Sequence, residues 1–326
     1  MCIRDRRNPN PYDGEPYYNL GLALRFQYRE DEAYEAFYKA VWNDAWQGAS
    51  YFQLTQIATK RKHYHDAIEL IDKSLLKQWH NHKARHLKAI LFRLTGQQEA
   101  AQQLADESLR IDRFNTGLIY EQFLLTNRED ILNKMHLVTQ GNIHHYIEIA
   151  LDYAWAGLFD NAIAFLKHGI AQQENSIYPT AWYYLGWFFN QANMNSEAIK
   201  FYKKAESEDP GVCFPNQLES VLALNDCIAS MADAAKAPYY LGNFYYHNRQ
   251  YDLALRNWEL SHNNDASYPT VNRNLALAYF NKTDRKKEAL SMLEKAFELN
   301  TADARVFMEL DALYKRINRD YSHRLE

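Results

Sequence analysis

Histidines are the residues of this chain whose spacing comes closest to a metal site. His82 and His86 are four positions apart, so on a helix both side chains would lie on one face. Zinc sites use three or four ligands, and no third ligand of clear identity accompanies this pair. Histidines on a solvated helix face explain the pattern more simply, and we predict no metal site and no cofactor.

Sequence motifs for catalysis are missing. The chain contains no G-x-S-x-G run, no P-loop, no G-x-G-x-x-G run and no H-E-x-x-H run. A hydrolase with two catalytic carboxyl groups would hold them about 5 to 10 Å apart, and no helix face offers such a pair. Carboxylates such as Glu30, Asp31 and Glu32 stand where helices are expected to begin and favour the helix dipole there. We predict that the protein is not an enzyme.

Composition predicts a folded, soluble protein. Of the 326 residues, 47% are hydrophobic and 24% are charged, and the formal net charge of −4 gives no attraction to nucleic acid or to an anionic membrane. No apolar run approaches the roughly 20 residues that span a bilayer. The three cysteines, Cys2, Cys213 and Cys227, form no C-x-x-C pair, which favours a reducing compartment and a cytoplasmic location.

The first residues, MCIRDR, resemble translated adapter sequence at the front of metagenomic gene models. We therefore expect residues 1–13 to be disordered or artefactual and the true protein to extend further upstream.

The stretch from Ala181 to Pro210 shows how the helices must be arranged. It predicts a helix, a turn and a second helix that ends at the proline, which cannot donate a backbone hydrogen bond. Small residues mark the positions where the two helices approach closely, and large residues fill the spaces between them. The small residues are Gly186, Ala198 and Ala205, and the large ones are Trp182, Leu185, Phe189 and Tyr202.

The same pattern recurs along the chain with a fixed period. Its key alanines Ala33, Ala67 and Ala101 follow one another at intervals of 34 residues. In this period and in the placement of its small residues the chain resembles tetratricopeptide repeat (TPR) proteins over roughly residues 14 to 318. The resemblance implies an all-α fold, a TPR-type superhelix of helix-turn-helix repeats with a concave binding face.

The repeats predict the organisation of the chain. We expect three TPR units in 14–115, two in 143–212 and two in 235–302. Residues 116–142 lack the small-residue positions and predict an irregular helical insert, which we expect to divide the array in two. An extra helix is predicted in 213–234, and a capping helix with a tail in 303–326.

In TPR proteins the first helix of each pair lines the groove, and the resemblance implies the partner-binding residues of this chain. These positions carry many aromatic rings, which supply contact area, and Asn and Arg side chains, which supply directional hydrogen bonds. An alternative interpretation is that some of the rings pack between helices. The predicted groove residues are Tyr183, Tyr184, Trp187, Asn190, Tyr239, Tyr240, Asn243, Tyr246, Arg273 and Asn274.

Some TPR domains hold the terminal carboxylate of a partner in a clamp of Lys, Asn and Arg residues. Asn243 and Asn274 match the two asparagines of that clamp, and Arg305 stands near a cationic position. Tyr239 and Glu309 replace two of the cations, so the match is incomplete and we do not predict a clamp.

Several runs, among them EPYYNLGLALRF and YPTVNRNLALAYFNK, resemble the C-terminal helical half of large bacterial proteins whose front half is domain of unknown function 5107. That front half is similar to carbohydrate-processing mutarotase-like domains. We therefore consider two functions. The first is a protein-protein interaction scaffold that binds a partner segment or an adjacent domain. The alternative is a helical accessory half of a carbohydrate-active or glycan-binding protein.

Overall fold

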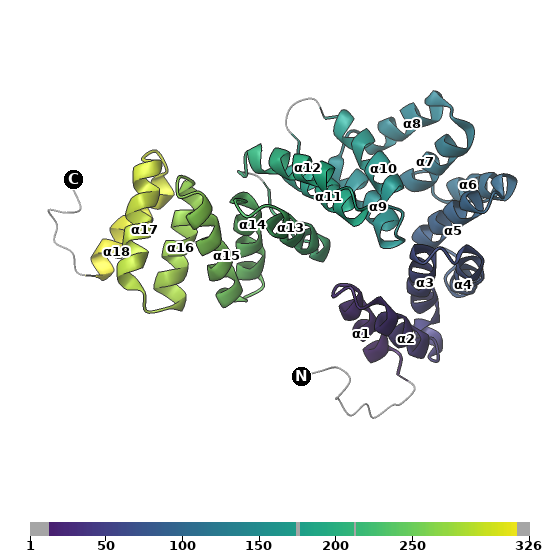
Figure 1. Ribbon diagram of the computed structural model, residues 1–326, viewed down its shortest axis with the longest axis horizontal. Coiled ribbons are helices and arrows are strands. Elements are labelled where there is room, and N and C mark those ends of the chain that lie inside the picture. The colour runs from purple at the N-terminus through teal and green to yellow at the C-terminus, as the bar shows by residue number, and fades with distance from the viewer. Residues whose placement is uncertain (1–12, 174–176, 212, 318–326) are drawn as a thin grey trace. The chain divides into compact units, whose positions relative to one another are not determined.

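The computed structural model describes residues 13–173, 177–211 and 213–317. Residues 1–12 of the N-terminus that we expect to be disordered or artefactual, and the end of the expected tail, lie outside the described residues. Within the described ranges the protein has eighteen α-helices and no β-strand (Figure 1). The chain divides into two compact units, Met1–Ile177 and Tyr178–Glu326. The all-α prediction is confirmed.

The first unit contains five consecutive pairs of helices. In each pair the two helices pack closely on each other. In the first three pairs the second helix also packs on the first helix of the next pair, whereas α8 does not pack on α9 in this way. The pairs are α1 (Glu15–Arg25) with α2 (Glu30–Ala40), α3 (Asp44–Lys60) with α4 (Tyr64–Lys77), α5 (His82–Leu94) with α6 (Gln98–Ile111), α7 (Thr116–Thr126) with α8 (Glu129–Thr139), and α9 (Ile143–Trp155) with α10 (Phe159–Ala171).

The second unit contains three pairs and two further helices. The pairs are α11 (Pro179–Gln191) with α12 (Asn195–Ser207), α14 (Lys236–His247) with α15 (Tyr251–Asn264), and α16 (Pro269–Lys282) with α17 (Lys286–Leu299). A single helix, α13 (Leu218–Ser230), stands between the first two pairs, and α18 (Ala304–Arg316) follows the last. Residues 116–142 form the pair α7 and α8 inside the first unit, and the division of the chain falls after residue 177 instead.

The turns within the first three helix pairs share one backbone geometry. Tyr28, Lys62 and Gly96, again 34 residues apart, have left-handed φ angles of 57°, 63° and 78°. The next amide then donates to a carbonyl one turn back, as Arg29 N does to Leu24 O at 3.0 Å, which ends the first helix. The 34-residue period of the sequence is therefore also a period of the backbone.

Glycines of the first helices lie against rings of the second helices. A Cβ atom at Gly186 would overlap the ring of Tyr202, and one at Gly242 would overlap the ring of Trp258. The ring of Phe37 lies on Gly21 in the same way. In these pairs the absence of a side chain on one helix makes room for a large ring on its partner.

Candidate functional site

A polar depression of about 280 Å³ lies between α14 and α16 in the second unit. Its lining residues come from three consecutive helices, and four of them belong to the ten predicted groove residues. The lining consists of Asn243, Tyr246, His247, Trp258, Arg273, Asn274 and Leu277. All of these side chains except Trp258 are half-buried or exposed, so the depression is open to a partner.

A chain of hydrogen bonds orients the two asparagines of this depression. The indole Nε1 of Trp258 can only donate, so Asn243 must turn Oδ1 toward it, at 3.1 Å. Nδ2 of Asn274 donates to the same oxygen at 3.1 Å. Nδ2 of Asn243 and Oδ1 of Asn274 have no hydrogen-bond partner within the described ranges, so the depression offers one donor and one acceptor side by side.

Arg273 is held at one side of the depression by Glu309 of α18. Its Nε donates to Glu309 Oε2 at 2.7 Å, and its Nη2 donates to the other carboxylate oxygen. Such two-point pairing fixes the plane of the guanidinium group. Two of the residues compared with the carboxylate clamp are engaged within the chain, because Glu309 pairs with Arg273 and Arg305 pairs with Asp303.

The other six predicted groove residues are not available to a partner in this structure. Asn190 is hydrogen-bonded to α13, and the remaining five lie in the hydrophobic core. The exposed fraction of each of these five aromatic side chains is at most 5%. The prediction that they lie open in a groove is therefore wrong for this structure, and the alternative of packing between helices holds for them. The five are Tyr183, Tyr184, Trp187, Tyr239 and Tyr240.

The extra helix α13 is the physical reason for part of this burial. It packs against α11 and covers the helix that the repeat pattern leaves open. The hydroxyl of Tyr184 lies 2.7 Å from Ser220 Oγ on α13. Nδ2 of Asn190 lies 2.9 Å from both carboxylate oxygens of Asp226, also on α13. A segment of the chain itself thus occupies the predicted partner surface of α11.

Tyr183 has a different structural role. Its hydroxyl donates to Glu206 Oε1 at 2.7 Å. The same carboxylate accepts the backbone amides of Ala235, Lys236 and Ala237 at 2.8 to 2.9 Å, at the beginning of α14. Glu206 therefore caps α14, where a negative charge is favourable, and Tyr183 holds the carboxylate in place.

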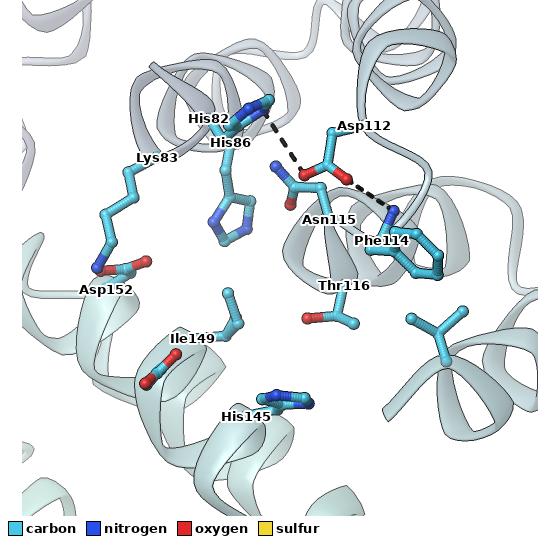
Figure 2. Close-up of a pocket in the computed structure, with 12 residues that line it drawn as sticks. His82, Lys83, His86, Asp112, Phe114, Asn115, Thr116, His145, Ile149 and Asp152 are labelled. Atoms are coloured by element: carbon cyan, nitrogen blue, oxygen red, sulfur yellow. Dashed lines mark hydrogen bonds and ion pairs between the residues drawn. The ribbon is translucent and has the colours of Figure 1, made fainter. Parts of the chain in front are cut away.

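A second pocket lies in the first unit and is shown in Figure 2. It has a volume of about 380 Å³ and is formed by α5, the turn before α7, the end of α8, and α9. An ion pair between Lys83 and Asp152, at 2.6 Å, links two of its walls, and His82 Nδ1 lies 3.8 Å from a carboxylate oxygen of Asp112. The other lining residues are His86, Phe114, Asn115, Thr116, Val138, His145, Glu148 and Ile149.

A buried polar network lies behind this pocket. Glu121 has an exposed fraction of 0% and accepts from Arg93 Nε at 2.6 Å. The hydroxyl of Tyr153 donates to Glu121 Oε1 at 2.5 Å, and His86 Nε2 lies 3.3 Å from that hydroxyl. These groups were absent from the predicted site. The sequence signal for this buried ion pair is Glu121, the one carboxylate within the apolar run GLIYEQFLL.

The two histidines whose spacing suggested a metal site, His82 and His86, lie in the first unit. Among the residues that the structure describes, no group of three or more His, Cys, Asp or Glu side chains could hold a metal ion. His82 and His86 both line the pocket of the first unit, but His86 is bonded to Tyr153. Burial is the main cause that lowers the pKa of His86, to about 4, which keeps its ring neutral at pH 7.

In the described part of the chain, no helix has the length and hydrophobicity that crossing a membrane requires. Cys213 and Cys227 are both free and buried.

The paired helices, the 34-residue period and the recurring left-handed turn are the marks of tetratricopeptide repeats. The chain has the TPR-type fold. No protein-family model matches the sequence, so the resemblance to proteins with domain of unknown function 5107 stays a prediction.

Solved structures similar to this chain include three TPR proteins. A MamA fragment from Desulfovibrio magneticus RS-1, from residue 41 to the end, is 17% identical over 54% of this chain and 85% of the fragment, with a TM-score of 0.29. YrrB, described as a TPR protein with an unusual peptide-binding site, is 13% identical over 73% of this chain and 96% of its own, with a TM-score of 0.26. The TPR domain of P58(IPK) is 14% identical over 94% and 99%, with a TM-score of 0.28. At these values the similarity does not extend to ligands.

Proposed function

We propose that the protein is a non-catalytic interaction scaffold that binds a partner segment, or an adjacent domain, at the depression between α14 and α16. The observation that carries this proposal is the oriented pair Asn243 and Asn274. A half-buried amide donor and a half-buried amide acceptor stand next to each other on two successive first helices.

This arrangement complements a peptide backbone. Each residue of an extended chain presents one N–H donor and one C=O acceptor, and a neighbouring donor and acceptor can pair with both. Tyr246 lies beside the asparagines and offers an aromatic ring to the side chains of the bound segment, and Arg273, paired with Glu309, forms a polar edge. Because Glu309 fixes the guanidinium group and Trp258 fixes Asn243, little side-chain entropy is lost on binding.

Selection of linear peptides from a displayed library tests the proposal. Enriched peptides are measured by fluorescence polarisation against the wild-type chain and against a double variant, Asn243→Ala with Asn274→Ala. Two lost hydrogen bonds predict an affinity loss of roughly tenfold.

The matched control is Asn257→Ala with Asn281→Ala, two asparagines of the same unit that lie outside the depression and donate to carbonyls of their own helices. Its affinity should equal that of the wild type, and circular dichroism should show equal helicity for all three proteins. Equal binding by the depression variant and the control, or a library that yields no binder, contradicts the proposal. A glycan array probed with the same three proteins tests the alternative, and glycan binding that disappears in the depression variant would favour the carbohydrate-related function.

A further inference from the structure

The pocket of the first unit, shown in Figure 2, combines buried and exposed hydrogen-bond acceptors in one cavity of about 380 Å³. It lies in a different unit from the depression between α14 and α16 and shares no residue with it. The hydrogen-bonding groups that this pocket offers depend on which atoms carry protons in the buried network behind it.

Proton positions in this network are determined by Glu121. The carboxylate is paired with Arg93 and only accepts, so the hydroxyl of Tyr153 must donate to it. Burial raises the pKa of Tyr153 well above its usual value, so the phenol keeps the proton that it donates. With its proton directed at Glu121, the oxygen of Tyr153 accepts from His86, and the His86 proton must therefore be on Nε2.

His86 then has a bare nitrogen. Because Nε2 carries the proton and the ring is neutral, Nδ1 is an acceptor. His86 has an exposed fraction of 2%, lines the pocket, and has no hydrogen-bond partner for Nδ1 in residues 13–173, 177–211 and 213–317. Because His86 lines the pocket, this acceptor can take a hydrogen bond from a ligand that brings an N–H or O–H group.

The charges around the cavity decide which donor fits. Three carboxylates line it, Asp112, Glu148 and Asp152, against one ammonium group, that of Lys83. Lys83 is engaged by Asp152, and Glu148 has no ion-pair partner among the described residues. Apart from its histidines, the lining carries two more negative than positive charges, which favours a cation.

Apolar groups complete the cavity. Val138 and Ile149 line it together with Phe114, whose exposed fraction is 60%. These side chains suit an aliphatic stem, and the ring of Phe114 can face a cation. The volume is within the range of about 300 to 1,000 Å³ that is usual for ligand pockets.

We propose that this pocket binds a cationic group with several N–H donors, the guanidinium or ammonium group of a basic side chain or of a free amine. His86 Nδ1 and the unpaired carboxylate of Glu148 accept its hydrogens, and Phe114, Val138 and Ile149 surround its carbon atoms.

Calorimetric titration of the full chain at low ionic strength tests this inference with four probes. These are acetyl-Gly-Arg-Gly-amide, acetyl-Gly-Lys-Gly-amide, agmatine as a free cation, and acetyl-Gly-citrulline-Gly-amide as a neutral isostere of the arginine peptide. We expect the cationic probes to bind and the citrulline peptide not to bind. Binding by the peptides alone would show that the cation is recognised as part of a polypeptide, whereas tighter binding by agmatine would identify a small amine as the ligand.

Glu148→Gln should weaken binding of the arginine peptide by about two- to fivefold, as for one partly exposed ion pair. Both Glu148 and the control residue, Glu69, are exposed on helices, so both variants should keep the wild-type unfolding temperature. Glu69→Gln lies outside the pocket and should leave binding unchanged. Equal binding of the arginine and citrulline peptides, equal losses in the two variants, or no binding of any cation by folded protein would overturn the proposal.

Discussion

Asn190 on α11 donates to both carboxylate oxygens of Asp226 on α13, with N–O distances of 2.9 Å. Tyr202 on α12 donates to the same carboxylate. The carboxylate therefore joins a complete TPR-type helix pair to the extra helix that follows it. The first helix of that pair is therefore covered by the protein's own chain.

Removing the Asp226 carboxylate should destabilise the second unit. Asp226→Ala leaves Asn190 and Tyr202 without their acceptor, and we expect a loss of about 1 to 3 kcal/mol in the free energy of unfolding. Urea titration of Asp226→Ala, Asn190→Ala and the double variant gives the coupling between the two residues. Additive losses would show that the pair contributes nothing of its own.

The cap that Glu206 forms on α14 gives a second prediction. Glu206→Ala removes the acceptor of three backbone amides and of the Tyr183 hydroxyl, and about 1 to 3 kcal/mol of unfolding free energy should be lost. Glu197→Ala is the matched control on the same helix, because Glu197 is exposed and pairs only with Lys200. Its effect should stay below about 0.5 kcal/mol. If both variants unfold at the same urea concentration, Glu206 does not stabilise the protein by capping α14.

Gly186 should not accept a methyl group, although alanine is the better helix former. A Cβ atom there would overlap the ring of Tyr202, so Gly186→Ala should cost about 1 to 3 kcal/mol through overpacking. The smaller side chain of Tyr202→Leu makes room for the methyl group. In thermal unfolding, Gly186→Ala should therefore be less harmful in a Tyr202→Leu background than in the wild type, and an equal cost in both backgrounds would contradict the contact.

Stability should depend on pH through His86. The unfolded chain takes up a proton near the usual pKa of 6.5, whereas the folded chain takes it up only near pH 4. The unfolded state therefore binds more protons in this window, and stability falls as the pH is lowered from 6.5 to 4. The loss due to His86 alone is roughly 3 kcal/mol, from about 1.4 kcal/mol for each pKa unit.

His86→Gln removes the titrating group and keeps a polar side chain. The difference in unfolding free energy between wild type and variant should shrink as the pH falls from 7 to 4. His144→Gln is the control, because His144 is exposed. A constant difference across this range would show that His86 is not held neutral by burial.

Much of the fold could be predicted because its signals are local. The 34-residue spacing of Ala33, Ala67 and Ala101 anticipated the helix pairs, and the pattern around Gly186 anticipated a close approach to Tyr202. The candidate site was predicted only in part. Asn243, Tyr246, Arg273 and Asn274 come together at one depression, whereas the aromatic residues of α11 are core.

The sequence by itself determined the helices, their pairing and the rings that fill the space between them, because helix periodicity and small-residue spacing act between near neighbours in the chain. Only the tertiary structure decided which first helices stay open. Asp226 meets Asn190 across 36 residues, and Tyr153 meets Glu121 across 32. The first contact depends on where the nonrepeating helix α13 packs, and the second on a carboxylate that the repeat pattern does not specify. The repeat pattern is the same for covered and open helices and carries no information about either contact.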